Sequence, residues 1–224
     1  MIKLRARGAC VALISFGVIN ISLIPQAQGS SNYRQVSFQQ VSSAPSSDVI
    51  DDERAPTGWK RYQFQYGGGD VFSIVLPKAP QESVENTRLA PTGAVTTHTF
   101  TSASEKSIYV ASYIEDLPVE VQRSPVAKQK FLESLWNGYT AAIGRAMKDK
   151  GLAELKVKLL ARRNRVVSGR QAQEQDFTIG NTFGRGRAVL AGRYVYMVMT
   201  LSPDAELTSE RASFLKLFEI HPKR

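Results

Sequence analysis

Two segments of this chain are apolar on both faces of an extended backbone, and they constrain the fold more than any other feature. Residues 108–114 read IYVASYI and residues 193–201 read RYVYMVMTL. Successive side chains of a strand point to opposite sides of its sheet, so a strand that is apolar on both sides is usually central and covered on both sides. The chain must therefore build a sheet with protecting elements on each face.

Shorter stretches of alternating polarity predict the other strands. They lie at residues 62–66, 72–76, 95–100, 155–159, 173–179 and 187–191. The first two are joined by a run of glycines and form a hairpin. Ser168-Gly169-Arg170 predicts another turn.

Helical patterns occur at two places. Ser124 suits the N-cap of a long helix and Pro125 its first position, and apolar residues then recur every three or four positions as far as Met147. A short helix follows Thr208 near the end of the chain. Strands grouped before and after the long helix predict an α+β fold, with a mainly antiparallel β-sheet flanked by one long and one short helix in an α/β/α sandwich.

The first 29 residues have the three regions of a bacterial secretory signal peptide. Basic residues precede an apolar run at residues 9–24, and the small residues Ala27 and Gly29 suit cleavage before Ser30. A membrane span needs ~20 predominantly apolar residues, so cleavage is favoured over an uncleaved anchor. The mature protein is then expected in the periplasm or outside the cell, and at a membrane only if the signal peptide is uncleaved.

Composition divides the rest of the chain in two. Residues 30–55 are dominated by serine and glutamine without apolar periodicity and predict a disordered linker, whereas residues 56–224 predict a single α+β domain.

Loss of residues 1–29 lowers the net charge from +9 to +6 and removes Cys10, the only cysteine. The mature chain can therefore form neither a disulfide nor a thiolate metal site.

Motifs of common enzymes and cofactor sites were sought and are absent from the sequence. Neither of the two histidines, His98 and His221, belongs to a His-Glu-x-x-His pattern, and there is no G-x-S-x-G elbow or phosphate-binding glycine loop. We expect His98 to be a surface or sheet residue and not a base, and His221 to be solvated. No catalytic, cofactor-binding or metal-binding residue is predicted, and no cofactor.

Basic residues gather after the long helix. Six of them fall within fifteen residues: Lys156, Lys158, Arg162, Arg163, Arg165 and Arg170. If these strands pair as a hairpin, several of the charges share a face and form a surface that attracts an anion or a partner. The alternative is a solvated sheet edge whose charges prevent edge-to-edge aggregation. Nucleic acid is not an expected partner of an exported protein.

Four short motifs carry a resemblance to a known family. They are FSIVLP at residues 72–77, YVASY at 109–113, RYVY at 193–196 and FLKLF at 214–218. Over residues 59–221 the chain resembles exported bacterial proteins with the PsbP-like or DcrB-like fold. The resemblance implies a non-enzymatic role, since photosynthetic members are extrinsic subunits of photosystem II and no catalytic set comes with the fold.

These observations together predict an exported, non-catalytic binding or assembly module of the bacterial envelope. Its expected partner is an unidentified protein or an anionic envelope component. The alternative is an exported, hydrolase-like enzyme with an unrecognised active site. A pocket with at least two convergent titratable groups would favour the enzyme.

Overall fold

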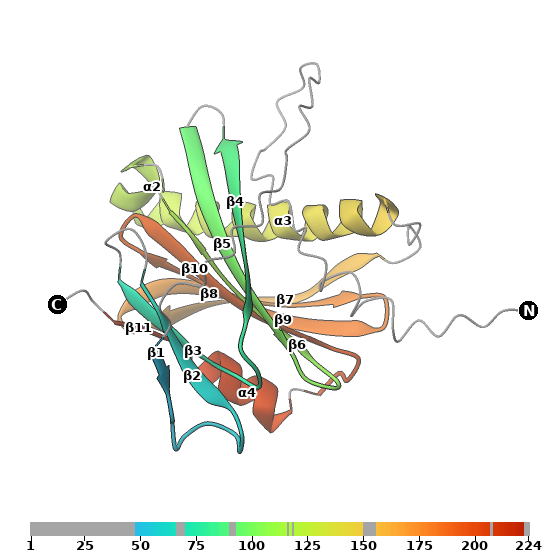
Figure 1. The fold of residues 1–224 in the computed structure, drawn as a ribbon. Coiled ribbons are helices and arrows are strands. Elements are labelled where there is room, and N and C mark those ends of the chain that lie inside the picture. The colour runs from blue at the N-terminus through green and yellow to red at the C-terminus, as the bar shows by residue number, and fades with distance from the viewer. Residues whose placement is uncertain are drawn as a thin grey trace, which may run out of the picture.

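Two antiparallel sheets and three helices make up the described part of the chain (Figure 1). The computed structural model describes residues 48–65, 70–89, 93–115, 117, 119–149, 156–206 and 208–221. The predicted signal peptide, residues 1–29, and residues 30–47 of the predicted linker lie outside this part. Among the described residues, none of the helices combines the length and the apolarity that crossing a membrane requires.

A seven-stranded antiparallel sheet, in the order β4-β5-β6-β10-β9-β8-β7, forms the centre of the molecule. Its strands are β4 (Gln81–Leu89), β5 (Gly93–Ala103), β6 (Ile108–Ile114), β7 (Val157–Val167), β8 (Arg170–Ile179), β9 (Thr182–Ala191) and β10 (Tyr194–Ser202). The two doubly apolar segments form β6 and β10, which pair with each other and are buried along their whole length. Their predicted central position is confirmed.

The long helix α3 (Pro125–Asp149) lies across one face of this sheet, after the short helix α2 (Val119–Arg123) (Figure 1). Ser124 caps α3 as predicted, since its Oγ accepts a hydrogen bond from the backbone N–H of Ala127 at 3.4 Å. Trp136 of α3 is completely buried, and its indole ring lies directly on Gly186 of β9. A side chain larger than hydrogen at that position would occupy the space of the ring.

A smaller sheet and the short helix cover the opposite face. The order of this sheet is β1 (Asp48–Ile50), β2 (Lys60–Phe64), β3 (Val71–Leu76) and β11 (Glu219–His221), and the helix is α4 (Ser209–Lys216). The apolar core between the two sheets on this side contains Phe72 and Ile74 of β3, which pack with Tyr109, Tyr196 and Phe214. The predicted α+β class is confirmed, and the second face is protected by a sheet as well as by the short helix.

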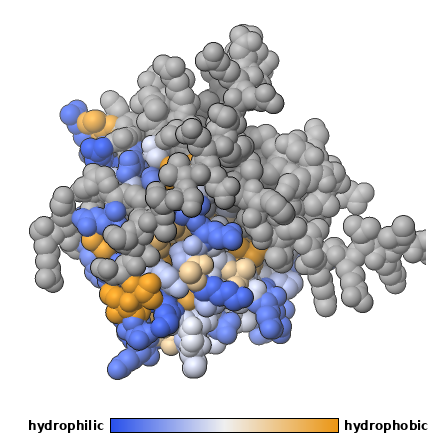
Figure 2. All heavy atoms as spheres, viewed as in Figure 1, coloured by the Kyte–Doolittle hydropathy of each residue, from blue (hydrophilic) through white to orange (hydrophobic). Residues whose placement is uncertain are grey.

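The last residues of the predicted linker, 48–55, belong to the folded domain. β1 pairs with β2 in antiparallel register, from Asp48 opposite Gln63 to Ile50 opposite Arg61. Figure 2 shows an apolar patch over β1, where Val49 and Ile50 are exposed. The domain therefore includes at least eight residues before the boundary expected at residue 56, because backbone pairing with β2 orders a segment that lacks an apolar pattern of its own.

Candidate functional site

The predicted basic group lies on the hairpin of β7 and β8, at one end of the large sheet. Lys158, Arg162, Arg163 and Arg165 are on β7, Lys156 directly precedes it, and Arg170 begins β8. In the described sheets β7 pairs with β8 on one side and with no described strand on the other. We call this outward side of residues 157–167 the β7 edge.

The six basic residues do not share one face of the sheet. Arg165 lies opposite Ala172, which is part of the core beneath the small sheet, so Arg165 and Arg163 face that side. Arg162 points the other way, and its Nη2 donates a hydrogen bond to Asn137 Oδ1 of α3 at 3.2 Å. The shared face predicted from the sequence therefore holds for part of the group.

Asp176 of β8 lies between arginines of the two neighbouring strands. Arg185 of β9 donates to it from Nε at 2.5 Å and from Nη2 at 2.9 Å, and Arg163 of β7 donates from Nη1 at 2.8 Å. Burial raises the pKa of Asp176, but the hydrogen bonds from Arg185 and Arg163 outweigh it, so the pKa is lowered overall. Asp176 is therefore a charged anchor for both arginines.

Glu174, two residues earlier on the same face, has a similar arrangement. Arg187 of β9 donates to it at 2.9 Å, while the guanidinium groups of Arg163 and Arg165 lie at 3.7 and 3.8 Å. Four arginines of β7 and β9 thus surround two carboxylates of β8. These six side chains on β7, β8 and β9 together carry two positive charges in excess.

The remaining basic residues differ in their surroundings. Lys156 and Lys158 are exposed. Arg170 instead forms an ion pair with Asp70 at 2.6 Å and a hydrogen bond to the carbonyl of Ile220 at 3.5 Å. Arg170 therefore fastens the large sheet to the small one and is not part of a free basic surface.

Three large apolar side chains of β7 are exposed, which the alternation of the sequence does not predict. Leu159, Leu160 and Val166 are 45%, 49% and 76% exposed. The register of β7 against β8 shifts between Leu159 and Ala161, which divides the strand into a short and a long regular part. The β7 edge therefore presents basic and apolar groups together.

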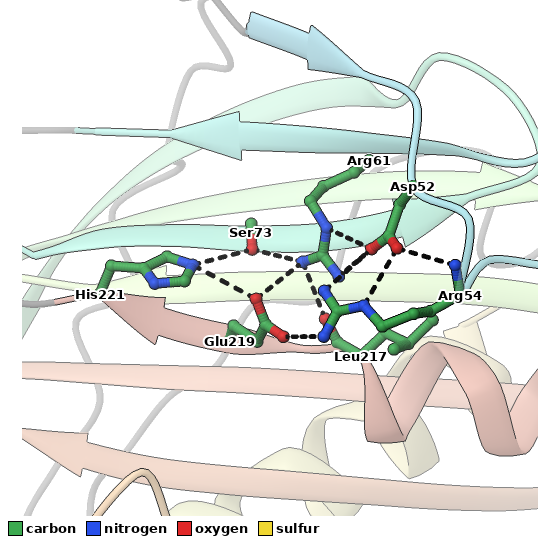
Figure 3. Close-up of polar contacts among 7 residues, drawn as sticks. All are labelled: Asp52, Arg54, Arg61, Ser73, Leu217, Glu219 and His221. Atoms are coloured by element: carbon green, nitrogen blue, oxygen red, sulfur yellow. Dashed lines mark hydrogen bonds and ion pairs between the residues drawn. The ribbon is translucent and has the colours of Figure 1, made fainter.

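A second group of polar side chains lies on the small sheet around Arg61, which is buried (Figure 3). The Arg61 guanidinium donates to Asp52 Oδ2 from Nε at 2.7 Å and from Nη2 at 2.5 Å. Its Nη1 donates to Ser73 Oγ at 2.6 Å and to the carbonyl of Leu217 at 3.0 Å. One side chain therefore joins β2 to β3, to the end of α4 and to the segment after β1.

Arg54 and Glu219 extend this Arg61 cluster. Arg54 donates to Asp52 Oδ1 at 3.1 Å and to Glu219 Oε1 at 2.9 Å, and Glu219 Oε2 lies 3.4 Å from Arg61 Nη1. The hydrogen bond from the Arg54 side chain is the largest cause that holds the pKa of Asp52 far below its ordinary value of 3.8. The cluster connects the first described residues to the last strand, β11.

The Arg61 cluster also brings together a serine, a histidine and a carboxylate. His221 Nε2 lies 3.4 Å from Ser73 Oγ and 3.4 Å from Glu219 Oε2 (Figure 3). In a serine-hydrolase relay the carboxylate holds Nδ1 while Nε2 faces the serine. Here both groups meet the same nitrogen, and Ser73 is fully buried. The set does not have the geometry of an activated nucleophile.

His98 was expected to be a surface or sheet residue, and His221 was expected to be solvated. His98 lies on β5 as expected, with Nδ1 3.0 Å from Glu82 Oε1 and its ring stacked on Tyr113 at 4.8 Å. His221 is about half exposed but also contacts Ser73 and Glu219. In the part of the chain that the structure describes, no group of three or more histidine, cysteine or carboxylate side chains is placed to hold a metal ion.

The chain is similar to solved structures at low sequence identity. None of the family models and none of the curated proteins searched matches the chain. Among solved structures, it is similar to cyanobacterial PsbP (CyanoP) from Synechocystis sp. PCC 6803, with a TM-score of 0.49 and 9% identity over 77% of this chain and 98% of that one. It is also similar to PA94, a protein of unknown function from Pseudomonas aeruginosa, with a TM-score of 0.28 and 12% identity over 76% and 92%.

Proposed function

We propose that this protein is an exported, non-catalytic binding or assembly module of the bacterial envelope, which contacts its partner through the β7 edge. One observation carries the proposal. β7 is an eleven-residue edge strand with four basic residues, no acidic residue and three exposed apolar side chains. An edge strand with exposed apolar side chains is a ready template for pairing with another chain. The partner is a protein or an anionic envelope component.

The ion pairs of the two carboxylates on β8 support a binding function over a catalytic one. Glu174 and Asp176 lie on the same face of β8, and both are held by arginines in fixed ion pairs. The lowered pKa of Asp176 makes this carboxylate a poor proton donor or acceptor near neutral pH. These groups therefore shape and position the hairpin that presents the β7 edge.

Affinity capture from bacterial envelope extract tests the contact. We compare the wild type with the Arg162→Glu/Arg163→Glu/Arg165→Glu variant, and with a matched control, Lys78→Glu/Lys106→Glu/Lys216→Glu, at three exposed lysines away from β7. A partner captured by the wild type and the control but lost with the edge variant supports the proposal, provided that circular dichroism shows all three proteins folded. Identical partners for the edge variant and the wild type would contradict it.

Export is tested separately. The predicted signal peptide favours release before Ser30, so protein recovered from the periplasm or the medium is expected to begin near that residue. N-terminal sequencing of the exported protein makes the measurement. An intact Met1 would show that cleavage does not occur.

A further inference from the structure

We infer that the β7 edge binds its partner by β-strand addition, and that the added strand is an extended protein segment in which carboxylate and apolar side chains alternate. The inference rests on the proposed function and specifies its partner. Three features of β7 carry it: a regular edge that pairs with no described strand, an excess of positive charge on one face, and exposed apolar side chains on the other.

The backbone of residues 161–167 supplies the regular edge. These seven residues pair with residues 170–176 of β8 without interruption, beginning directly after the register shift. In an antiparallel sheet the backbone N–H and C=O groups of a strand point alternately to its two sides. Those that point away from β8 can therefore pair with an incoming strand, which is how many domains bind extended peptides.

The face toward the small sheet favours carboxylates. The side chains of Arg163 and Arg165 are 38% and 51% exposed, and they share Glu174 and Asp176 with two further arginines. Residues directly opposite on neighbouring strands have Cβ atoms about 4.5–5.5 Å apart, and opposite charges there stabilise the pair. Acidic residues of an added strand would neutralise the positive charge that the two carboxylates of β8 do not balance.

The face toward α3 favours apolar side chains. Val166 alternates with Arg165 along the strand and therefore projects on this side. It is the most exposed of the three exposed large apolar residues of β7. Leu159 lies on the same side, because it is opposite Phe177 of the core beneath α3. A strand added here would bury both residues if its own side chains on this face were apolar. Arg162 also lies on this face, where its guanidinium donates a hydrogen bond to α3, so Leu159 and Val166 supply the exposed apolar surface that an added strand would meet. Free positive charge on one face and this apolar surface on the other define the alternation.

A second copy of this chain fits the β7 edge poorly. Antiparallel pairing of two such edges about Asn164 would set Arg163 of one copy opposite Arg165 of the other. Like charges directly opposite each other destabilise a strand pair. The charges that disfavour this pairing of two copies favour an acidic partner.

Binding of synthetic peptides to the full-length protein tests strand addition. The probe is a nine-residue peptide of alternating glutamate and valine. One control alternates lysine and valine, and the other has the composition of the probe with its glutamates and valines in two blocks. Fluorescence anisotropy measures affinity, and hydrogen exchange measures protection of the backbone amides of residues 161–167.

We expect the alternating acidic peptide to bind at least tenfold more tightly than either control peptide and to slow exchange in residues 161–167. Arg163→Glu/Arg165→Glu should weaken this binding at least tenfold, whereas the matched exposed pair Lys78→Glu/Lys106→Glu should leave it unchanged. Both lysines lie outside β7 and are exposed.

Strand addition is overturned if the probe does not bind, if the block peptide binds equally well, or if binding protects no amide of residues 161–167. Competition of the probe by anionic phosphatidylglycerol vesicles without such protection would identify a lipid surface instead, and dimerisation through β7 would identify a second copy. If strand addition fails while the edge variant still loses its envelope partner, the proposed function stands. If the edge variant retains that partner, the proposed function fails, whatever the peptides do.

Discussion

At the scale of single residues, Arg61 shows how the fold accommodates a buried charge. In the sequence, Arg61 alternates with Tyr62 in a half-buried strand, which predicts a solvent-facing side chain. In the structure it is 4% exposed, because Asp52 and the carbonyl of Leu217 receive its hydrogen bonds. Leu217 is 156 residues away along the chain. A local pattern cannot predict such a partner.

Replacing Asp52 should be costly. Asp52→Asn leaves buried N–H groups of Arg61 with a weaker acceptor, so we expect the free energy of unfolding to fall by about 1–3 kcal/mol. Urea unfolding at pH 7 measures the change. Glu53→Gln removes the same charge from the adjacent exposed residue and should change stability by less than about 0.5 kcal/mol. Equal effects of the two substitutions would show that Arg61 does not depend on Asp52.

The same residue predicts a pH dependence. The pKa of Asp52 is lower in the folded protein than its ordinary value of 3.8, so its ion pairs stabilise the fold above that value. This contribution is lost as the pH falls below 3.8 toward the folded-state pKa. The difference in unfolding free energy between the wild type and Asp52→Asn should therefore shrink as the pH is lowered from about 5 to about 2. A constant difference would contradict the assignment.

At the scale of elements, the contact between α3 and β9 depends on a glycine. A Cβ atom at Gly186 would lie 2.4 Å from Cη2 of the completely buried Trp136. Gly186→Ala should therefore destabilise the domain by about 1–3 kcal/mol through overpacking. Trp136→Phe removes the outer ring, so the two changes together should cost less than the sum of the two alone. Denaturant unfolding of the four proteins measures this coupling, and simple additivity would argue against the contact.

Elements differ in how well local sequence predicts them. The turn before β8 is confirmed, since Ser168 and Gly169 have φ values of 49° and 73° and join β7 to β8. The strand predicted at residues 155–159 extends to Val167 in the structure, where arginines interrupt the apolar alternation. β4 was not predicted, because QESVENTRL is mostly polar and becomes a strand by pairing with β5. Strands at the two ends of the sheet are therefore the ones that the pattern describes least well.

At the scale of the whole molecule, residues 48–55 close the small sheet. They add β1 beside β2 and bring Asp52 and Arg54 to Arg61 and Glu219. A chain that begins at residue 56 should therefore have a Tm about 5–10 °C below that of a chain that begins at residue 48, given about 2–4 °C for each kcal/mol in a domain of this size. Calorimetry measures both. Equal Tm values would show that these residues are not needed for the fold.

The sequence by itself determined the features that depend on near neighbours: the two central strands, the capped helix α3, the turn before β8, the α+β class and the presence of a basic group after the long helix. These follow from side-chain alternation and capping within a few residues. Only the tertiary structure decided that β7 is the last strand at one end of the sheet formed by the described residues, that Arg170 and Arg163 are held by Asp70 and Asp176, and that Arg61 is buried. The order of strands in a sheet depends on contacts between residues far apart in the chain, and that order decides which charges are neutralised and which remain at the β7 edge.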